Sequence, residues 1–568
     1  MKVLLTAVNA KYIHSNLAVY SLKGYASEYS ENIGISEYTI NQGTDEILAD
    51  IYRQAPEVLC FSCYVWNAIY VRQLITEIKK VLPHVHIWIG GPEVSYNALD
   101  FLKSHPQVEG VMRGEGEETF LELMHYFTGK ITGLENVKGI VYRRPGDVDT
   151  EPVIVENPWR PAMDMDKLPF VYYHNLEKFE NKIIYYESGR GCPFTCSYCL
   201  SSIDRCLRFR SLQLVKKELQ FFIDSGVPQV KFVDRTFNCS HKHAMGVWSY
   251  LAEHDKGKTN FHFEVAADLL SEEELELIES MRPGLIQLEI GVQSTNPDTI
   301  REIRRVMKFD KVSKCVSRVR AGENVHQHLD LIAGLPYEDY ESFRHSFNDV
   351  YALRPDQLQL GFLKVLKGSH MHEMAGEYQL QYQDRPPFEV LSTSWLPYSD
   401  VIRLKGIEEM VEVYYNSGQF TNTLLLLERA FPNAFAMYEE LSGYYKKNDL
   451  NMVNHSRIAR YEILFDFAAE SDVMNKKTYR ELLTVDLYLR DNVKNRPAFA
   501  GEPTVTKEEA AKFYAEEAAW HNYLKGYEAY DKRQVRKMTH LEKIDGRLLL
   551  FDYKNRSLLT NQASIFYI

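Results

Sequence analysis

The sequence predicts a mixed α/β protein with two sheet-containing domains followed by a mainly helical region. Three observations predict this. Residues 2–130 alternate apolar runs with helix-like stretches, a second alternating series starts near Lys182, and the pattern turns helical after about residue 400. Alternation of this kind indicates parallel strands with helices on the faces of the sheet. Hydrophobic residues make up 45% and charged residues 25% of the 568, as in ordinary globular proteins.

The first domain, residues 1–135, is expected to be doubly wound. Five strands of this kind suit a flavodoxin-like (Rossmann-type) sheet, which binds ligands at the carboxyl ends of its strands. The runs read KVLLTAV, ISEYTI, EVLCFSCY, HIWIGG and VEGVMRG. Residues 136–180 are rich in Pro and Asp and show no sustained period, so they are predicted to be a connector.

The second domain, residues 181–385, repeats the alternation six times. Six βα units indicate an open or partial (β/α)6 barrel, with function at the carboxyl ends of the strands. The strands read KIIYYESG, QVKFVD, NFHFEVAA, LIQLEIGV, VHQHLDLIAG and QLQLGFLKV. Residues 386–568 are predicted to be mainly helical, with two or three short strands within the final stretch 547–568.

Charge and cysteine content limit the class of protein. A formal net charge of −12 argues against a protein that coats nucleic acid. The first residues lack a signal-peptide cleavage site, and no apolar run reaches the roughly 18 residues that span a bilayer, so we expect a cytoplasmic protein without membrane insertion. Three of the eight cysteines cluster, and in a reducing compartment clustered thiols favour metal binding.

The cysteine cluster follows the first barrel strand in SGRGCPFTCSYCLSS. Thiolates of Cys192, Cys196 and Cys199 could hold three irons of a four-iron, four-sulfur cluster and leave the fourth iron open. The alternatives are a zinc site that lacks a fourth ligand, or three free thiols. Cys206 is not expected to be the fourth ligand, because it lies seven residues further on in a basic segment.

With Tyr198, the cluster reads C-x3-C-x-aromatic-C, which resembles the radical S-adenosylmethionine (SAM) superfamily. The segments LEIGVQS and DLIAGLP resemble the fourth and fifth strand motifs of that barrel. The resemblance implies that SAM binds the open iron and is cleaved to a 5′-deoxyadenosyl radical, with electrons from a donor such as flavodoxin or ferredoxin. The implied SAM contacts are Tyr198, Asp234, Glu264, Gly291, Gln293 and Gly334. For the polar members the alternative is a satisfied core residue, and Arg235 competes with Asp234 for the methionyl amine.

The glycines of IGGPEVSYN and RGEGEETFLEL end the fourth and fifth strands of the first domain. This arrangement resembles the cobalamin-binding domain fused ahead of many radical SAM barrels. The residues that would face cobalamin are Tyr12, His14, Ser15, Asn16, Ser62, Gly90, Gly91, Gly114 and Glu115. The D-x-H-x-x-G motif is absent, which implies base-off binding. The alternatives are a domain that has lost cobalamin and, for His14, a polar loop residue.

The resemblance therefore implies an enzyme that uses a 4Fe-4S cluster, SAM and cobalamin, and that methylates an unreactive carbon or phosphorus centre through methylcobalamin. Two alternatives stay open: a rearrangement, cyclisation or reduction without methyl transfer, and a cobalamin- or redox-sensing regulator. The substrate could be a small metabolite, a lipid, a peptide or a modified nucleoside. It is expected between the two domains, with Lys364 and His370 as candidate contacts. The region after residue 400 is expected to act as a lid or side wall.

Overall fold

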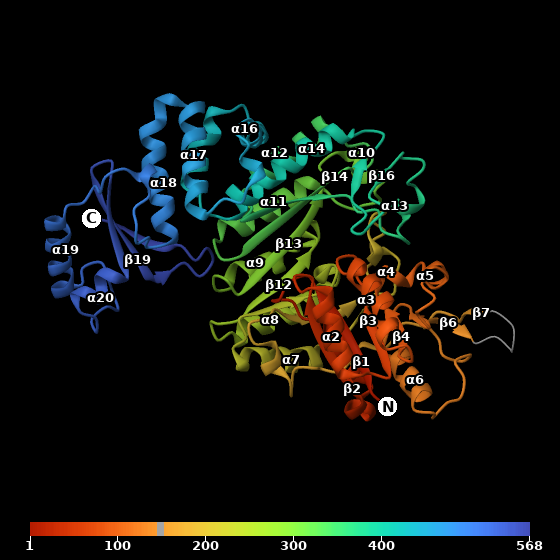
Figure 1. Ribbon diagram of the computed structural model, residues 1–568. Helices are drawn as coiled ribbons and strands as arrows, with labels where there is room; N and C mark the ends of the chain where they lie inside the picture. Colours follow the sequence, from red (N-terminus) through yellow and green to blue (C-terminus); the bar gives the residue numbers. More distant parts are fainter. Residues whose placement is uncertain (145–152) are drawn as a thin grey trace.

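A computed structural model describes residues 1–144 and 153–568. Figure 1 shows the N-terminal domain in red and orange beside a yellow and green barrel, with the C-terminal segment in blue on the barrel's other side. No helix of the described ranges is long and apolar enough to cross a membrane.

The N-terminal sheet has the order β2-β1-β3-β4-β5-β6-β7, and its first five strands are parallel. The predicted doubly wound, flavodoxin-like domain is thus confirmed. The sequence missed β6 and β7, which pair antiparallel within the range expected to begin the connector. The strands are β1 (Val3–Asn9), β2 (Ile33–Thr39), β3 (Val58–Ser62), β4 (His86–Gly90), β5 (Gly110–Met112), β6 (Ile140–Arg144) and β7 (Val153–Glu156).

Both faces of this sheet are covered, because side chains alternate between the faces along each strand. Leu4 and Val8 of β1 pack with α2, α3 and α5, whereas Val3 and Leu5 pack with α1 and α6. The helices are α1 (Leu17–Tyr25), α2 (Thr44–Gln54), α3 (Ala68–Val81), the short α4 (Pro92–Ser95), α5 (Ala98–Ser104) and α6 (Glu117–Phe127).

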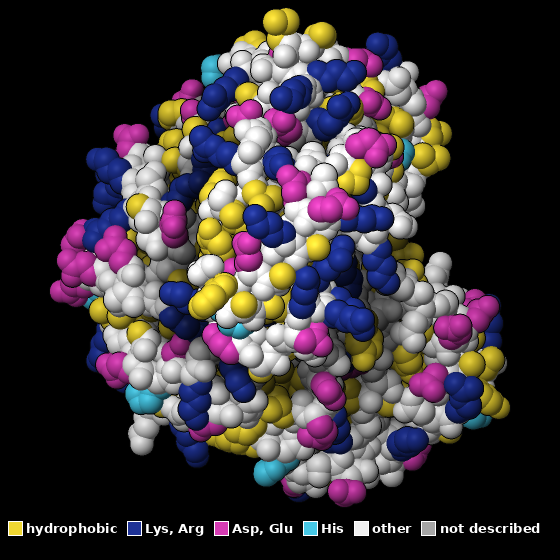
Figure 2. Space-filling model, turned by 90° about the vertical axis from the view of Figure 1, so that its left-hand side faces the viewer, with side chains coloured by type: hydrophobic (Ala, Val, Ile, Leu, Met, Phe, Trp, Pro, Cys, Tyr) yellow, Lys and Arg dark blue, Asp and Glu magenta, His cyan; other side chains and the backbone are white. Residues whose placement is uncertain are grey.

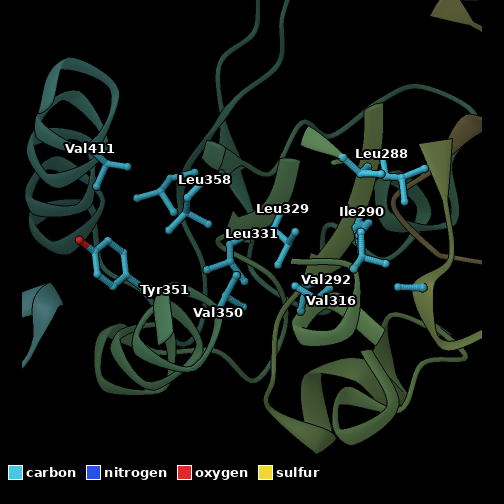
Figure 3. Packing of buried hydrophobic residues seen from close by; sticks show 14 of the residues in the cluster. Leu288, Ile290, Val292, Val316, Leu329, Leu331, Val350, Tyr351, Leu358 and Val411 are labelled. Carbon is cyan, nitrogen blue, oxygen red and sulfur yellow. The ribbon is translucent and has the colours of Figure 1, made fainter. Parts of the chain in front are cut away.

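The second sheet has six parallel strands in the order β15-β14-β13-β12-β11-β8, which confirms the predicted partial barrel. On β13 alternate residues are fully buried, and Figure 3 shows Leu288, Ile290 and Val292 pointing toward the surrounding helices. Polar residues occupy the other, inward face. The strands are β8 (Ile184–Tyr186), β11 (Gln229–Phe232), β12 (Asn260–Val265), β13 (Ile286–Gln293), β14 (His326–Ala333) and β15 (Gln357–Phe362).

The sequence of residues 298–320, DTIREIRRVMKFDKVSKCVSRVR, reads as a single helical stretch, but in the structure it is broken. It divides into α10 (Pro297–Glu302) and α11 (Phe309–Ala321), and Arg304 between them has a left-handed φ of 55°. The break matters because the loop it creates reaches the cysteine cluster. The other barrel helices are α7 (Leu212–Ser225), α8 (His241–His254), α9 (Glu272–Ser280) and α12 (Tyr340–Ala352).

The C-terminal region is mainly helical, as predicted, and ends in an antiparallel sheet of order β18-β19-β20. Its helices share one hydrophobic core with the barrel's outer face, where Val411 lies near Leu358 and Tyr351 (Figure 3). The elements are α14 (Tyr398–Met410), α15 (Thr421–Leu427), α16 (Ala434–Lys447), α17 (Arg457–Ser471), α18 (Lys476–Arg490), α19 (Lys507–Trp520), α20 (Lys532–Lys537), β18 (Thr539–Ile544), β19 (Arg547–Arg556) and β20 (Ala563–Tyr567).

The region after residue 400 was expected to act as a lid or a side wall, and the structure places it at the side of the barrel and not over the strand ends. The side chain of Asn416 hydrogen-bonds both backbone groups of Leu358 near the start of β15, and the Leu558 carbonyl lies near Gly284 before β13. The helices therefore flank the barrel. The carboxyl ends are bordered instead by residues 370–396, which contain α13 (His370–Glu373), β16 (Gln381–Tyr382) and β17 (Val390–Ser392).

Candidate cluster and cofactor site

The three cysteines lie on a loop closed by a short antiparallel pair, β9 (Gly189–Arg190) with β10 (Arg208–Phe209). Cys192 and Cys196 are only 8% and 7% exposed, and Cys199 is partly exposed. The loop backbone is held from two sides, because the Ser197 amide donates to Ile303 and its carbonyl accepts from Met371, at 2.9 and 2.8 Å. Cys206 is exposed, as expected of a thiol outside the cluster, and its role stays a prediction.

Arg305 is a residue of this site that sequence reasoning missed. Its Nη1 lies 3.8 Å from Cys196 Sγ and 3.3 Å from the Tyr198 hydroxyl, while Nη2 donates to the Gly291 carbonyl. Burial raises the pKa of Cys196, and the guanidinium opposes that shift. The available signal was the Arg-Arg pair in an otherwise amphipathic helical stretch, but only the broken helix brings it to the cysteines.

Gln293 and Gly291 meet at the carboxyl end of β13, where the register with β14 shifts. Gln293 has a left-handed φ of 74°, a strained conformation for a residue with a side chain, and its buried Oε1 has no partner among the described residues. Gly334 was expected to let backbone approach a ligand. In the structure a Cβ there would lie 2.8 Å from Val390 Cγ1, so packing against β17 already requires the glycine.

The two candidate carboxylates differ in their surroundings. Glu264 ends β12, and burial raises its pKa to about 7 against the opposing effect of Arg235, whose Nη1 is 3.8 Å away. Asp234 is engaged by the protein itself. Its two oxygens accept from the hydroxyl and the amide of Ser188, at 2.6 and 2.9 Å. Asp234 thus anchors the chain just before the cysteine loop, and its role toward SAM stays a prediction.

The N-terminal domain presents its predicted residues at the carboxyl ends of its strands. A Cβ at Gly91 (φ 112°) would lie 2.4 Å from the Cys63 carbonyl oxygen, so this glycine is already required by the protein backbone. At Gly114 (φ 69°) the nearest atom, in Trp159, would be 3.4 Å away. Gly90 is the last residue of β4 and does not have a positive φ, and a Cβ there would lie 3.4 Å from Met112. Tyr12 is 66% exposed beside these strand ends.

Several of the predicted cobalamin residues make hydrogen bonds within the protein. Asn16 caps α1 by accepting from Val19 and donates to Ser62 Oγ at 3.1 Å. Ser15 Oγ donates to the Ile183 carbonyl, and His14 Nδ1 lies 2.6 Å from the Tyr185 hydroxyl. The first strand-to-helix loop therefore docks on β8 of the barrel.

Charged pairs join the cysteine loop to the N-terminal domain. Arg190, two residues before Cys192, contacts Glu117 and Glu187, and Arg208 on the paired strand contacts Glu115. Burial lowers the pKa of Arg190, but Glu187 and Glu117 outweigh it and hold that pKa above its ordinary value. Glu115, predicted to face cobalamin, is thus also a bridge between the domains. The carboxyl ends of the two sheets consequently face each other, as expected.

The two candidate substrate residues, His370 and Lys364, contact different segments of the protein. His370 Nε2 is 2.8 Å from an Arg304 nitrogen, next to the residue that meets the cysteine loop. Lys364 is exposed, and its backbone bridges to Glu389. Only His370 is therefore close to the cluster loop.

The residues present fit the three expected groups. Three thiols on one loop, with Cys199 and Cys192 near enough to Cys196 to affect its pKa, offer the donors that iron–sulfur clusters prefer. The buried Gln293 Oε1 and Arg305 Nε have no partner in the ranges the structure describes, and both face the strand end beside the cysteines. On the N-terminal domain, exposed Tyr12 and Trp66 in the loops after β1 and β3, and exposed Trp159 beside Gly114, offer apolar surface for a corrin.

Comparison with known proteins agrees with this site. Residues 3–124 match the B12 binding domain, residues 186–350 the radical SAM superfamily, and residues 376–566 a family described as protein of unknown function (DUF4080). The chain therefore contains a B12-binding domain followed by a radical SAM domain. The predicted cobalamin is confirmed at the level of the domain, and the radical SAM match implies the cluster and SAM.

Relatives of this chain include several methyltransferases. The cobalamin-dependent radical SAM methyltransferase TokK of Streptomyces tokunonensis is 27% identical over 66% of this chain and 59% of its own length. An anaerobic magnesium-protoporphyrin IX monomethyl ester cyclase of Rubrivivax gelatinosus is 23% identical over 59% of this chain and 61% of its own. The chain thus spans about three-fifths of these relatives. The solved structure of the cobalamin-dependent SAM radical enzyme OxsB superposes with a TM-score of 0.57 at 15% identity, covering 85% of this chain and 78% of that one, and shows the shared fold.

Proposed function

We propose that this protein is a cobalamin-dependent radical SAM methyltransferase that alkylates an unreactive carbon or phosphorus centre. The observation that carries the proposal is the opposition of two strand-end faces. The face of the B12-binding domain and the face with the cysteine loop are held together by Arg190, Arg208, Glu115 and Glu117. A substrate between them would meet both cofactors, and domain interfaces are common ligand sites.

The roles of individual residues follow from their positions. Cys192, Cys196 and Cys199 would hold the cluster, while Arg305 and Gln293 would hold the carboxylate and amine of SAM. Glu264, next to the last residue of β12, would accept hydrogen bonds from a ribose. When bound, the cluster with SAM supplies a carbon radical, and cobalamin supplies a transferable methyl group.

We further propose that the protein works in the cytoplasm with an external donor of the flavodoxin or ferredoxin type. Many iron–sulfur clusters have reduction potentials well below zero, so a strong reductant is required. The distribution of charge on the surface bears on whether the protein binds nucleic acid. Figure 2 shows Lys and Arg interspersed with Asp and Glu on the face that carries the C-terminal segment, which favours a solvated surface over a nucleic-acid footprint.

The test uses SAM with a deuterated methyl group. Anaerobically reconstituted protein, loaded with cobalamin, is incubated with reduced flavodoxin as the electron donor and with an extract of cells that lack this protein. We expect 5′-deoxyadenosine together with a labelled product three mass units heavier than its unlabelled counterpart. Cys192→Ala should abolish both, and Cys206→Ala is the matched control that should retain both.

Each other outcome discriminates between the alternatives. 5′-Deoxyadenosine without any labelled product would contradict methyl transfer and favour a rearrangement, cyclisation or reduction, as in the cyclase relatives. A protein that holds all three cofactors and cleaves no SAM under any reductant would leave only a sensing role.

A further inference from the structure

The inward face of the barrel contains a group of metal-ligating side chains that the proposed function does not use. Glu289 lies on β13, and His328 and Asp330 lie on β14 with the i, i+2 spacing that puts both side chains on one face. Glu289 is directly opposite His328 in the sheet register. One ligand atom from each of the three lies within 4.8 Å of the others.

The geometry within this group is that of converging ligands, not of a hydrogen bond. His328 Nε2 and Asp330 Oδ1 are 2.9 Å apart, and in the described part of the chain neither atom makes a hydrogen bond of acceptable geometry. His328 is 8% exposed. Two atoms that each lie about 2.1 Å from one ion are roughly 3 Å apart in octahedral coordination and roughly 3.4 Å apart in tetrahedral coordination. A cation between them would satisfy both atoms at once.

We propose that Glu289, His328 and Asp330 form a binding site for one divalent first-row metal ion, separate from the cysteine cluster. One imidazole with two carboxylates suits Zn²⁺ or Fe²⁺ better than Mg²⁺ or Ca²⁺, which prefer oxygen ligands alone. His262 extends the set, because its Nε2 is also buried without a hydrogen-bond partner among the described residues and lies 3.0 Å from Glu289 Oε2.

One neighbour opposes the metal. Lys231 Nζ is 2.9 Å from the same Oε2 of Glu289, so its ammonium neutralises part of the negative charge and repels a cation. The two kinds of substitution should therefore change metal affinity in opposite directions. Removing the ammonium should strengthen metal binding, whereas removing a ligand should weaken it.

The site lies inside the barrel beneath the strand end where SAM is expected. Asp330 is paired with Gly291 in the sheet, and Glu289 and His328 are paired two residues earlier along the same strands, further from the carboxyl end. The metal site would therefore be reached from the interior of the barrel and would not share a ligand with the cluster. Its existence does not depend on methyl transfer.

The test measures a metal that is not part of the cluster. Protein reconstituted with about four irons per chain, but without cobalamin because that cofactor contains cobalt of its own, is equilibrated with Co²⁺, and the cobalt bound per chain is measured by elemental analysis after free metal is removed. We expect one cobalt per chain. His328→Ala and Asp330→Asn should each weaken binding by about tenfold or more and retain the iron, while Lys231→Met should tighten it.

The matched control is His326→Ala, which removes a histidine from the same strand and the same inward face, two residues from His328. It should bind cobalt as the unmodified protein does. Cobalt stoichiometry and affinity that are unchanged by both His328→Ala and Asp330→Asn would overturn the proposal. Asp330→Asn, which keeps the side-chain volume, covers the case in which His328→Ala does not fold.

Discussion

Glu338 offers a prediction whose magnitude follows directly from the structure. Its side chain connects the ends of β13 and β14, because Oε1 accepts from Ser294 Oγ at 2.6 Å and from Ser346 Oγ at 3.0 Å. The residue is 1% exposed, and its other oxygen has no partner among the described residues. Burial raises the pKa of this carboxyl from 4.5 to about 8. Ser294 directly follows Gln293, so Glu338 supports the predicted SAM contact.

The sign of the pH dependence follows from this shift. Between pH 4.5 and about 8 the folded protein keeps a proton that the unfolded chain has released, so the free energy of unfolding falls as pH rises. Each pH unit is worth about 1.4 kcal/mol, and the difference of about 3.5 units therefore costs about 5 kcal/mol. The stability that the protonated Glu338 carboxyl gives the folded protein is therefore fully present below pH 4.5 and is lost as pH rises through about 8.

Glu338→Gln removes this titration and keeps the carbonyl oxygen that accepts from the two serines. We expect the variant to match the unmodified protein near pH 5 and to be more stable at pH 9, in urea unfolding followed by fluorescence across that range. Glu341→Gln makes the same change at a largely exposed position of α12 and should follow the unmodified protein. Parallel stability curves for Glu338→Gln and the unmodified protein would refute the reasoning.

Three further predictions concern the cluster and the domain contact. Arg305→Met should lower SAM affinity at least tenfold by removing the cation beside Cys196, with the iron content unchanged, as measured by equilibrium binding; unchanged affinity would show that Arg305 only packs the loop. Arg190→Met leaves Glu117, which is 6% exposed, without its partner and should lower the free energy of unfolding by about 3–5 kcal/mol, as measured by thermal unfolding. Arg301→Met, which breaks an exposed ion pair, is the control, and a fall in melting temperature for Arg190→Met no larger than that of the control would contradict the contact. Gly114→Val should reduce retained cobalamin because its φ of 69° disfavours a side chain, and full retention would move cobalamin away from this loop.

The local patterns of the sequence were sufficient for most of the architecture. Alternation of apolar residues gave the first five strands of the N-terminal sheet and all six of the barrel, because a strand or helix must bury one face. The spacing of Cys192, Cys196 and Cys199 gave the expected cluster, since thiols on one short loop need little help from the rest of the chain to converge. Strands β6 and β7 were missed because their apolar pattern is weak: β6 buries only its first three residues, and β7, at the edge of the sheet, is only partly buried.

Contacts between distant segments could be decided only by the tertiary structure. Asp234 and Glu115 carry polar groups at strand ends, which suggested ligands, but folding brings Ser188 and Arg208 against them. Arg305 lies over a hundred residues from Cys196 in sequence, and only the break before α11 turns its guanidinium toward the thiol. Sequence determines which faces are apolar and which loops carry thiols, whereas the partners of a buried charge depend on which segments the fold brings together, because Coulomb energy depends on distance in space.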